Sequence, residues 1–372
     1  MSVHELALQR SKYKHLSDDE WRWFLQQVEG RERTADKLPM FATIDDWWYP
    51  VRLSCEQCSS ELTARYKASI ISNSGAQFSN FADLTAGYGV DTYFLSEHFA
   101  HTDYVEQNAE LCRIAEHNFS IQHSAISIRH STAEEFLQTA GRYDLIYADP
   151  ARRDSHGGKV FRLADCTPNI VELLPTLIQH LRAGGRLMFK LSPMLDITQA
   201  VKELSAASIQ WSVYVVAVKN EVKEVLLLSG GDETITAIDL AEPEKKFVFT
   251  KEEEQDCPST LHCLPFTFLY EPNAAILKAG AYKLVAQRYG LAKLDVNTHL
   301  YASDKPVEDF PGRVWKITNA PSPMTNANIV CRNYPMTPEQ LKKKLHLRDG
   351  GTTFVIGCRV SGKPTLFYAE RV

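Results

Sequence analysis

Short β-rich runs alternate with amphipathic helical segments over residues 65 to about 235, and this alternation constrains the fold more than any other feature. We expect strands over residues 81–84, 102–106, 126–130, 143–148, 186–190, 212–218 and 222–228. Helical stretches such as 109–119 and 169–181 separate the first five strands, which is typical of a parallel sheet wrapped by helices. The last two strands are too close for a crossover helix, so we expect them to be antiparallel. The sequence therefore predicts an α/β fold.

Segments of different character lie on both sides of this pattern. Residues 1–64 are expected to form a helical extension, because Ser17 to Glu20 has the residues of a capping box and apolar side chains follow at helical spacing. At the other end, Gly230-Gly231 and the charged stretch 242–256 indicate a boundary. Polar sequence without periodicity contributes little to a core.

Beyond this boundary we expect an α+β domain without internal repeats. Its elements are helices around 273–289 and 337–346, strands near 298–302, 314–318 and 328–332, and a terminal hairpin over 353–360 and 365–369. We place the domain boundaries at residues 1–64, 65–235, 236–300 and 301–372, where 236–300 holds a linker and the start of the C-terminal α+β region.

The composition indicates a soluble protein of the cytoplasm with no membrane partner. The apolar runs are far too short to span a bilayer, and the N-terminus has no signal-peptide pattern. The 8 cysteines are spread thinly along 372 residues, unlike the dense framework of a small secreted domain. We expect them to be free thiols.

The charges are distributed unevenly although the net charge is only −5. Residues 260–372 hold 15 lysines and arginines against 8 aspartates and glutamates. Lys342-Lys343-Lys344, followed by His346 and Arg348, extends this basic character over the last predicted helix. A basic C-terminal third indicates an anionic partner, although a solvated basic face explains the same counts equally well.

A glycine turn between the first predicted strand and the following helix indicates a nucleotide-like ligand. Its residues are Asp83-Leu84-Thr85-Ala86-Gly87-Tyr88-Gly89-Val90-Asp91. Glycine permits positive φ and close approach of a ligand to the backbone. Thr92 stands where the third glycine of a dinucleotide fingerprint would be. The second strand ends at Glu106, whose carboxylate can accept hydrogen bonds from both hydroxyls of an adenosine ribose.

This D-x-x-x-G-x-G turn, with the acid after the second strand, resembles the class I S-adenosylmethionine-dependent methyltransferases over residues 65–230. The resemblance implies a Rossmann-like sheet and S-adenosylmethionine as cofactor. It implies that Asp83, Gly87 and Gly89 lie under the methionine part, with Thr85, Ala86 and Asp91 beside them. Glu106 would hold the ribose, Ala133 and Glu134 would contact the adenine, and Asp149 would face the methyl group.

The whole chain also resembles a bacterial group of methyltransferases that carry a C-terminal THUMP-like domain. The resemblance rests on Glu56 to Glu61, on Asp149-Pro150-Ala151-Arg152 and on Tyr270-Glu271-Pro272-Asn273. It implies an N-terminal helical extension, a ferredoxin-like segment within residues 236–300 and a THUMP-like domain over 301–372. THUMP domains bind RNA in related enzymes, so the implied partner is RNA such as tRNA or rRNA.

Asp149-Pro150-Ala151-Arg152 follows the fourth predicted strand, where an α/β sheet exposes its ligand crevice. It resembles the Asn/Asp-Pro-Pro-aromatic motif of amino-methylating enzymes, but Ala151 and Arg152 replace the second proline and the aromatic residue. Uridine C5 enzymes with Asp-Pro-Pro-Arg use a cysteine nucleophile, and the nearest thiol, Cys166, is expected to be structural.

A second resemblance concerns the ribose 2′-O-methyltransferases, which use a Lys-Asp-Lys-Glu set. Lys67, Asp149, Lys190 and Glu224 occupy comparable places along this chain. Ammonium groups near a hydroxyl stabilise a developing alkoxide. Lysine and glutamate are common residues, so chance placement explains the set as readily.

We therefore expect an S-adenosylmethionine-dependent methyltransferase that acts on a base amine or ribose 2′-hydroxyl of RNA. The alternatives are a catalytically silent RNA-binding protein with a methyltransferase fold and a small-molecule methyltransferase. No metal is expected, because Cys55-Glu56-Gln57-Cys58 has no second pair at zinc spacing and the histidines form no zinc motif.

Overall fold

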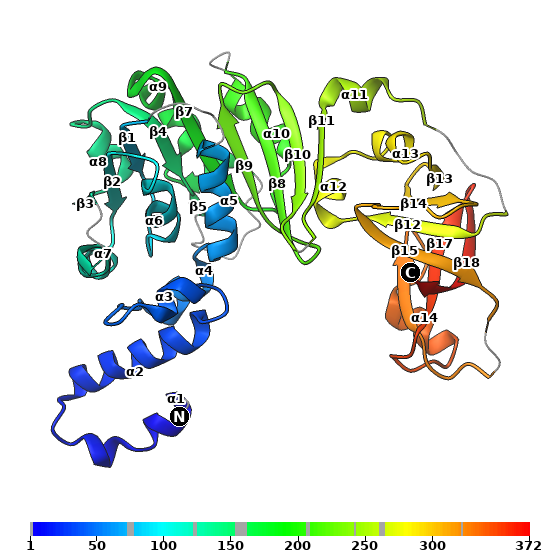
Figure 1. Ribbon diagram of the computed structural model, residues 1–372, viewed down its shortest axis with the longest axis horizontal. Helices are drawn as coiled ribbons and strands as arrows, with labels where there is room; N and C mark the ends of the chain where they lie inside the picture. Colours follow the sequence, from blue (N-terminus) through cyan, green and yellow to red (C-terminus); the bar gives the residue numbers. More distant parts are fainter. Residues whose placement is uncertain are drawn as a thin grey trace. The chain divides into compact units, whose positions relative to one another are not determined.

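The chain divides into two units, and the division passes through the last strands of the predicted sheet. Figure 1 labels helices and strands of both units. The first unit contains Met1–Ser212 and Val225–Asp232, and the second contains Val213–Glu224 and Glu233–Val372. The structure is a computed structural model, and it describes residues 3–72, 78–121, 125–152, 162–205, 209–241, 243–259, 265–320 and 323–372.

The first unit is built on a sheet whose strands match the predicted ones. They are β1 (Asn80–Asp83), β2 (His101–Glu106), β3 (Ile126–His130), β4 (Tyr143–Ala148), β7 (Leu181–Leu191) and β9 (Glu221–Ser229). Their order is β9-β7-β4-β1-β2-β3, with β9 antiparallel to β7 and the other pairs parallel. Helices cover this sheet, so β4 is buried almost throughout. The α/β prediction is confirmed.

Helices and short elements complete this unit. They are α1 (Val3–Ala7), η1 (Arg10–Tyr13), α2 (Asp18–Thr34), α3 (Pro39–Thr43), α4 (Arg52–Gln57), α5 (Glu61–Ser72), α6 (Val90–Ser96), α7 (Ala109–Ile121), α8 (Ala133–Leu137), β5 (Ala151–Arg152), η2 (Leu163–Asp165), β6 (Cys166–Thr167), α9 (Ile170–Gln179) and α10 (Ile197–Leu204). The predicted capping box is present at α2: Glu20 N donates to Ser17 Oγ at 3.3 Å, and Ser17 N donates to Glu20 Oε2 at 2.7 Å. No helix in the described ranges has the length and apolar character to cross a bilayer.

Aromatic residues attach the N-terminal helices to the glycine turn. Trp47 Nε1 donates a hydrogen bond to the Tyr88 hydroxyl at 2.9 Å, and that hydroxyl donates to the Trp48 carbonyl at 3.1 Å. The Trp48 ring stacks on His117 of α7, with the ring centroids 3.7 Å apart. The extension is therefore packed against the elements that form the cofactor turn.

Strands β8 (Trp211–Val218) and β9 are neighbours joined by the two-residue turn Lys219-Asn220. Both turn residues have positive φ, 51° and 63°, as a type I′ turn between antiparallel strands requires. The predicted antiparallel pair is therefore present. Asn220 Oδ1 also accepts from Ala274 N at 2.8 Å, which caps a helix of the second unit.

The division between the two units falls at Asp232, next to Gly230-Gly231, but the charged stretch 242–256 that we expected to be linker contains regular structure. Residues 234–256 contain β10 (Thr234–Asp239), which is parallel to β8, then β11 (Lys245–Thr250), which is antiparallel to β10, and α11 (Lys251–Asp256). In β11 the buried Phe247 and Phe249 alternate with the exposed Lys246 and Val248. This alternation spans only a few residues and is flanked by charged residues, so the sequence analysis did not identify it as a strand.

The second unit continues with a seven-stranded sheet in the order β13-β14-β12-β15-β18-β17-β16. Its elements are β12 (Phe268–Pro272), α12 (Ala274–Ala279), α13 (Leu284–Arg288), β13 (Ala292–Asp295), β14 (Thr298–Ser303), β15 (Gly312–Thr318), β16 (Asn328–Arg332), α14 (Pro338–Lys344), β17 (Thr353–Val360) and β18 (Lys363–Arg371). The single helix predicted over 273–289 is two helices, because Gly280 has φ 86° and ends the first.

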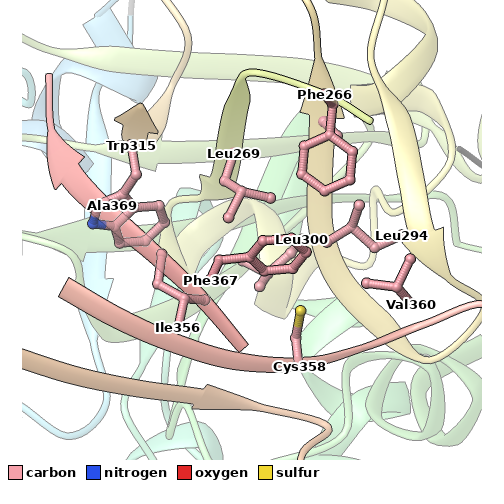
Figure 2. Close-up of a cluster of buried hydrophobic side chains, with 11 residues drawn as sticks. Phe266, Leu269, Leu294, Leu300, Trp315, Ile356, Cys358, Val360, Phe367 and Ala369 are labelled. Atoms are coloured by element: carbon pink, nitrogen blue, oxygen red, sulfur yellow. The ribbon is translucent and has the colours of Figure 1, made fainter. Parts of the chain in front are cut away.

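Apolar side chains from several of these strands form one core in the second unit (Figure 2). Trp315 of β15 and Leu300 of β14 are almost completely buried in it, together with Ile356 of β17. Phe367 of β18 stacks obliquely on Phe266, with the ring centroids 5.3 Å apart. This core holds the C-terminal sheet together.

Candidate active site

The glycine turn after β1 forms the floor of the candidate site. Gly87 and Gly89 have φ of 56° and 82°, a region that side chains disfavour. A Cβ at Gly89 would lie 2.7 Å from Phe119 Cζ, so this position also lacks space for a side chain. The Asp149 backbone N donates to Thr85 Oγ1 at 2.6 Å, which ties the end of β4 to the same turn.

Asp83, at the end of β1, is buried and holds the turn from inside. Its Oδ1 accepts from Thr85 N at 3.0 Å, and its Oδ2 accepts from Thr92 Oγ1 at 2.6 Å. Burial raises the pKa of Asp83 to about 7, although these two hydrogen bonds oppose the shift. Thr92, which we noted only as a missing glycine, is therefore a hydrogen-bond partner of Asp83.

Glu106, at the end of β2, faces the turn. Its Oε2 accepts from Gly87 N at 2.9 Å, and its Oε1 accepts from Asn108 N at 2.8 Å. A carboxylate oxygen has two lone pairs, so each oxygen keeps capacity for a ligand hydroxyl. The two acceptor oxygens fit a ribose that presents two hydroxyls.

A pocket of about 290 Å³ lies over the turn and brings all of the predicted cofactor residues together, with the predicted catalytic Lys190. Its lining includes the expected Asp83, Thr85, Ala86, Gly87, Gly89, Asp91, Glu106, Ala133, Glu134, Asp149 and Lys190. Sequence reasoning missed another part of the lining, which consists of Ser54, Gln57, Cys58, Ser59, Gln107, Leu111, Ser131, Thr132, Thr167 and Pro168. Of these, Gln57 to Ser59 belongs to the segment Glu56 to Glu61, on which the family resemblance partly rests. That segment was the sequence signal that could have identified them as pocket residues.

An ion-pair network connects the pocket to the protein interior. Lys190 Nζ on β7 forms an ion pair with Asp149 Oδ2 and lies 3.7 Å from Asp91 Oδ2. Lys67 Nζ on α5 lies 3.2 Å from Asp91 Oδ1. Burial raises the pKa of Asp91, but the charges of Lys67 and Lys190 and the hydrogen bonds from Ser59 and Tyr147 together outweigh burial, so the net pKa is lowered. Asp91 is therefore the anionic partner of two lysines, a contact that we did not expect for a residue of the cofactor turn.

The remaining predicted catalytic residues are placed differently. Pro150 links β4 to β5, and Arg152 ends β5, where it pairs with Cys166 of β6. The Arg152 side chain lies outside the described residues. Glu224 is buried on β9, within the residues assigned to the second unit. Cys166 is buried and is not among the residues of the pocket.

Burial raises the pKa of both cysteine thiols of the extension. Cys55 is buried, and burial raises the pKa of its thiol to about 12. Cys58 lines the pocket, and its Sγ lies 3.2 Å from the Cys55 carbonyl oxygen. In the described part of the chain, no group of three or more His, Cys, Asp or Glu side chains is arranged to hold a metal ion.

A parallel sheet with an antiparallel strand beside β7, a glycine turn after β1 and an acid after β2 define a class I methyltransferase fold and site. Comparison with known proteins agrees. Residues 268–311 match the ferredoxin-like domain family, and residues 316–371 match the THUMP domain-like family. An uncharacterised S-adenosylmethionine-dependent methyltransferase of Mycobacterium tuberculosis is 21% identical over 91% of this chain and 92% of its own length.

A solved structure extends this similarity to nearly the whole chain. The crystal structure of a Porphyromonas gingivalis W83 protein assigned as a methyltransferase is 30% identical, with a TM-score of 0.83. The match covers 96% of this chain and 92% of that one. The chain therefore belongs to the S-adenosylmethionine-dependent methyltransferases with a C-terminal THUMP-like domain. When bound, S-adenosylmethionine supplies an electrophilic methyl group on its sulfonium.

Proposed function

We propose that this methyltransferase acts on RNA and that the acceptor group binds beside the Asp149 and Lys190 side chains. The observation that carries the choice of RNA is the match of residues 316–371 to the THUMP domain-like family. The basic balance of the C-terminal third supports it, because Lys343, Lys344 and Arg348 are exposed on and after α14. Exposed cations of this kind bind phosphates.

The Asp149 and Lys190 pair favours a ribose hydroxyl as the acceptor. A hydroxyl loses its proton as its oxygen takes the methyl group, and in this proposal Asp149 accepts that proton. The Lys190 ammonium stabilises the negative charge that develops on the oxygen. An amine nitrogen instead gains positive charge as it takes the methyl group, which a neighbouring ammonium opposes.

A base amine is the second candidate acceptor, and Asp149-Pro150 at the end of β4 favours it. In that chemistry Asp149 and a backbone carbonyl accept the hydrogens of the amine, and Lys190 has no part in the chemical step. The two candidates therefore assign the same role to Asp149 and different roles to Lys190.

The test is single-turnover methyl transfer to RNA from a strain of the source organism that lacks the gene. Asp149→Ala should slow transfer by about a hundredfold or more, the range of one positioned acid-base group, with the Kd for S-adenosylmethionine within a few-fold of wild type. Lys190→Ala should slow transfer comparably for a hydroxyl acceptor and little for an amine. Lys202→Ala, an exposed lysine on α10, is the matched control.

Mass spectrometry of the nucleosides from the same RNA identifies the modified atom. Methylated ribose would support the first candidate, and a methylated exocyclic amine would support the second. Wild-type protein that binds the cofactor but methylates no RNA would contradict the proposal and favour a small-molecule acceptor or a silent enzyme. Full activity in Asp149→Ala would contradict the acceptor site.

The cytoplasm is the compartment that we propose for this activity. RNA is available in the cytoplasm, and thiols in the described part of the chain are free, among them Cys55, Cys58, Cys112, Cys257, Cys331 and Cys358. Free thiols persist in a reducing compartment.

A further inference from the structure

Ser59, from the segment between α4 and α5, is a junction of the ion-pair network described above. Its Oγ lies 2.7 Å from Asp91 Oδ2, 3.4 Å from Lys67 Nζ and 3.2 Å from Lys190 Nζ. Ser59 is 7% exposed, so these contacts are shielded from water. The N-terminal extension thus places a hydroxyl among charged groups that come from α5, α6 and β7.

The chemistry of the three partners determines the direction of every hydrogen bond at Ser59. A carboxylate only accepts and an ammonium only donates, whereas a hydroxyl has one donor and two acceptor lone pairs. The Ser59 hydroxyl therefore donates to Asp91 and accepts from Lys67 and Lys190. All of its hydrogen-bonding capacity is used, which allows one arrangement of the network.

Burial decreases along this network toward the pocket. The Lys67 side chain is fully buried, the Asp91 and Lys190 side chains are 10% and 14% exposed, and the Asp149 side chain is 38% exposed. Tyr147 of β4 anchors the buried end, because its hydroxyl donates to Asp91 Oδ2 at 2.8 Å. The interior groups thus hold Lys190, and Lys190 in turn contacts the more exposed Asp149.

We infer that Ser59 is a positioning residue for methyl transfer: it orients the Lys190 ammonium against Asp149, so the N-terminal extension completes the catalytic site. The inference rests on the proposed function, because it takes Asp149 and Lys190 as the acceptor site. It adds a residue from outside the methyltransferase sheet. In this assignment the hydroxyl acts on the reaction through Lys190.

The test compares Ser59→Ala, Ser59→Thr and Ser60→Ala in the full chain. Ser60 is the neighbouring serine, and its Oγ accepts from Thr63 N at 3.2 Å at the start of α5. Ser59→Ala should slow single-turnover methyl transfer by roughly ten- to a hundredfold, the cost of misplacing a reacting group by about 1 Å. The Kd for S-adenosylmethionine and the Kd for RNA should stay within a few-fold of wild type. Ser59→Thr, which keeps the hydroxyl, should recover most of the rate.

The control separates positioning from folding. Ser60→Ala should lower the melting temperature through loss of a helix cap and leave the transfer rate unchanged. A Ser59→Ala protein with the wild-type rate would overturn the inference, as would a loss of cofactor affinity that matches the loss of rate. A Ser59→Thr protein as slow as Ser59→Ala, with an unchanged melting temperature, would also overturn it. Absence of RNA methylation by the wild type would contradict the proposed function itself. The series distinguishes this outcome from failure of the inference, which shows only in the comparison of the Ser59 variants with an active wild type.

Discussion

In the cofactor turn, burial of Asp83 opposes ionisation of its carboxyl group. Its carboxyl group is 1% exposed, and the carboxylates of Asp91 and Asp149 add to the effect of burial on its pKa. The pKa rises from the ordinary 3.8 to about 7. The folded protein thus holds a proton on Asp83 over a pH range in which the unfolded chain has released it.

We predict that Asp83 makes the folded state less stable as pH rises from about 4 to about 7. The folded state binds more protons than the unfolded state in this window, so the free energy of unfolding falls with rising pH. Asp83→Asn has no such proton to lose. Its melting temperature relative to wild type should therefore increase across the window and stay constant above about pH 7, as measured by calorimetry at a series of pH values.

Thr92→Val provides the matched variant for this prediction. It removes a hydrogen bond to Asp83 Oδ2 that lowers the carboxyl pKa, so the decline in stability should extend to higher pH. A difference between Asp83→Asn and wild type that does not vary with pH would show that the pKa of Asp83 is the same in the folded and unfolded states, and would contradict the prediction.

At the scale of elements, the connection from β1 to α6 depends on the backbone of Gly89. Its φ of 82° is unfavourable for a residue with a side chain, and Phe119 of α7 occupies the space of a Cβ. The helix α6 therefore starts at this turn only because Gly89 has no side chain. The same close approach places α7 beside the turn.

Gly89→Ala should destabilise the first unit by about 2–4 kcal/mol, from backbone strain and from overlap with Phe119. This corresponds to a melting temperature roughly 5–10 °C lower. Gly141→Ala is the control, because a Cβ there meets no atom within 4 Å and the backbone φ is not positive. Thermal unfolding of both variants measures the effect. Equal melting temperatures would contradict the role assigned to Gly89.

At the scale of the whole molecule, the charge is divided between an acidic body and a basic C-terminal third. Residues 260–372 carry 15 basic against 8 acidic side chains, while the full chain has a net charge of −5. A negatively charged body repels nucleic acid, so the proposed RNA binding would be confined to the basic part of the chain. Lys343 and Lys344 of α14, with Arg348 after it, are exposed parts of that surface.

We predict that RNA binding by the full chain weakens steeply as salt rises, because bound phosphates release counterions. Replacing Lys343, Lys344 and Arg348 together by alanine should make the slope of log affinity against log salt shallower by about 2–3. Filter binding at several salt concentrations measures it. Replacing the exposed Lys12, Lys14 and Arg22 of the N-terminal extension is a control of equal charge. Equal effects of the two triple variants would contradict binding through the C-terminal region.

The sequence by itself determined the parts of the molecule that depend on residues close together in the chain. The strands β1 to β4 were recognisable because each is a short β-rich run next to a helical segment, and parallel strands align their carboxyl ends. This alignment is enough to place Glu106 beside the turn that begins at Asp83. The positions of Asp83, Gly87 and Gly89 follow from one nine-residue motif.

Only the tertiary structure decided which charged groups meet at the pocket. Ser59 and Asp91 lie 32 positions apart, and Lys190 lies 131 positions beyond Ser59. Their contact depends on how α5 packs against α6 and on the registers of β4 and β7, which residue type and spacing do not specify. The same holds for β10 and β11, whose weak local pattern becomes a sheet through pairing with β8. Long-range packing energy, which a local pattern does not contain, selects these contacts.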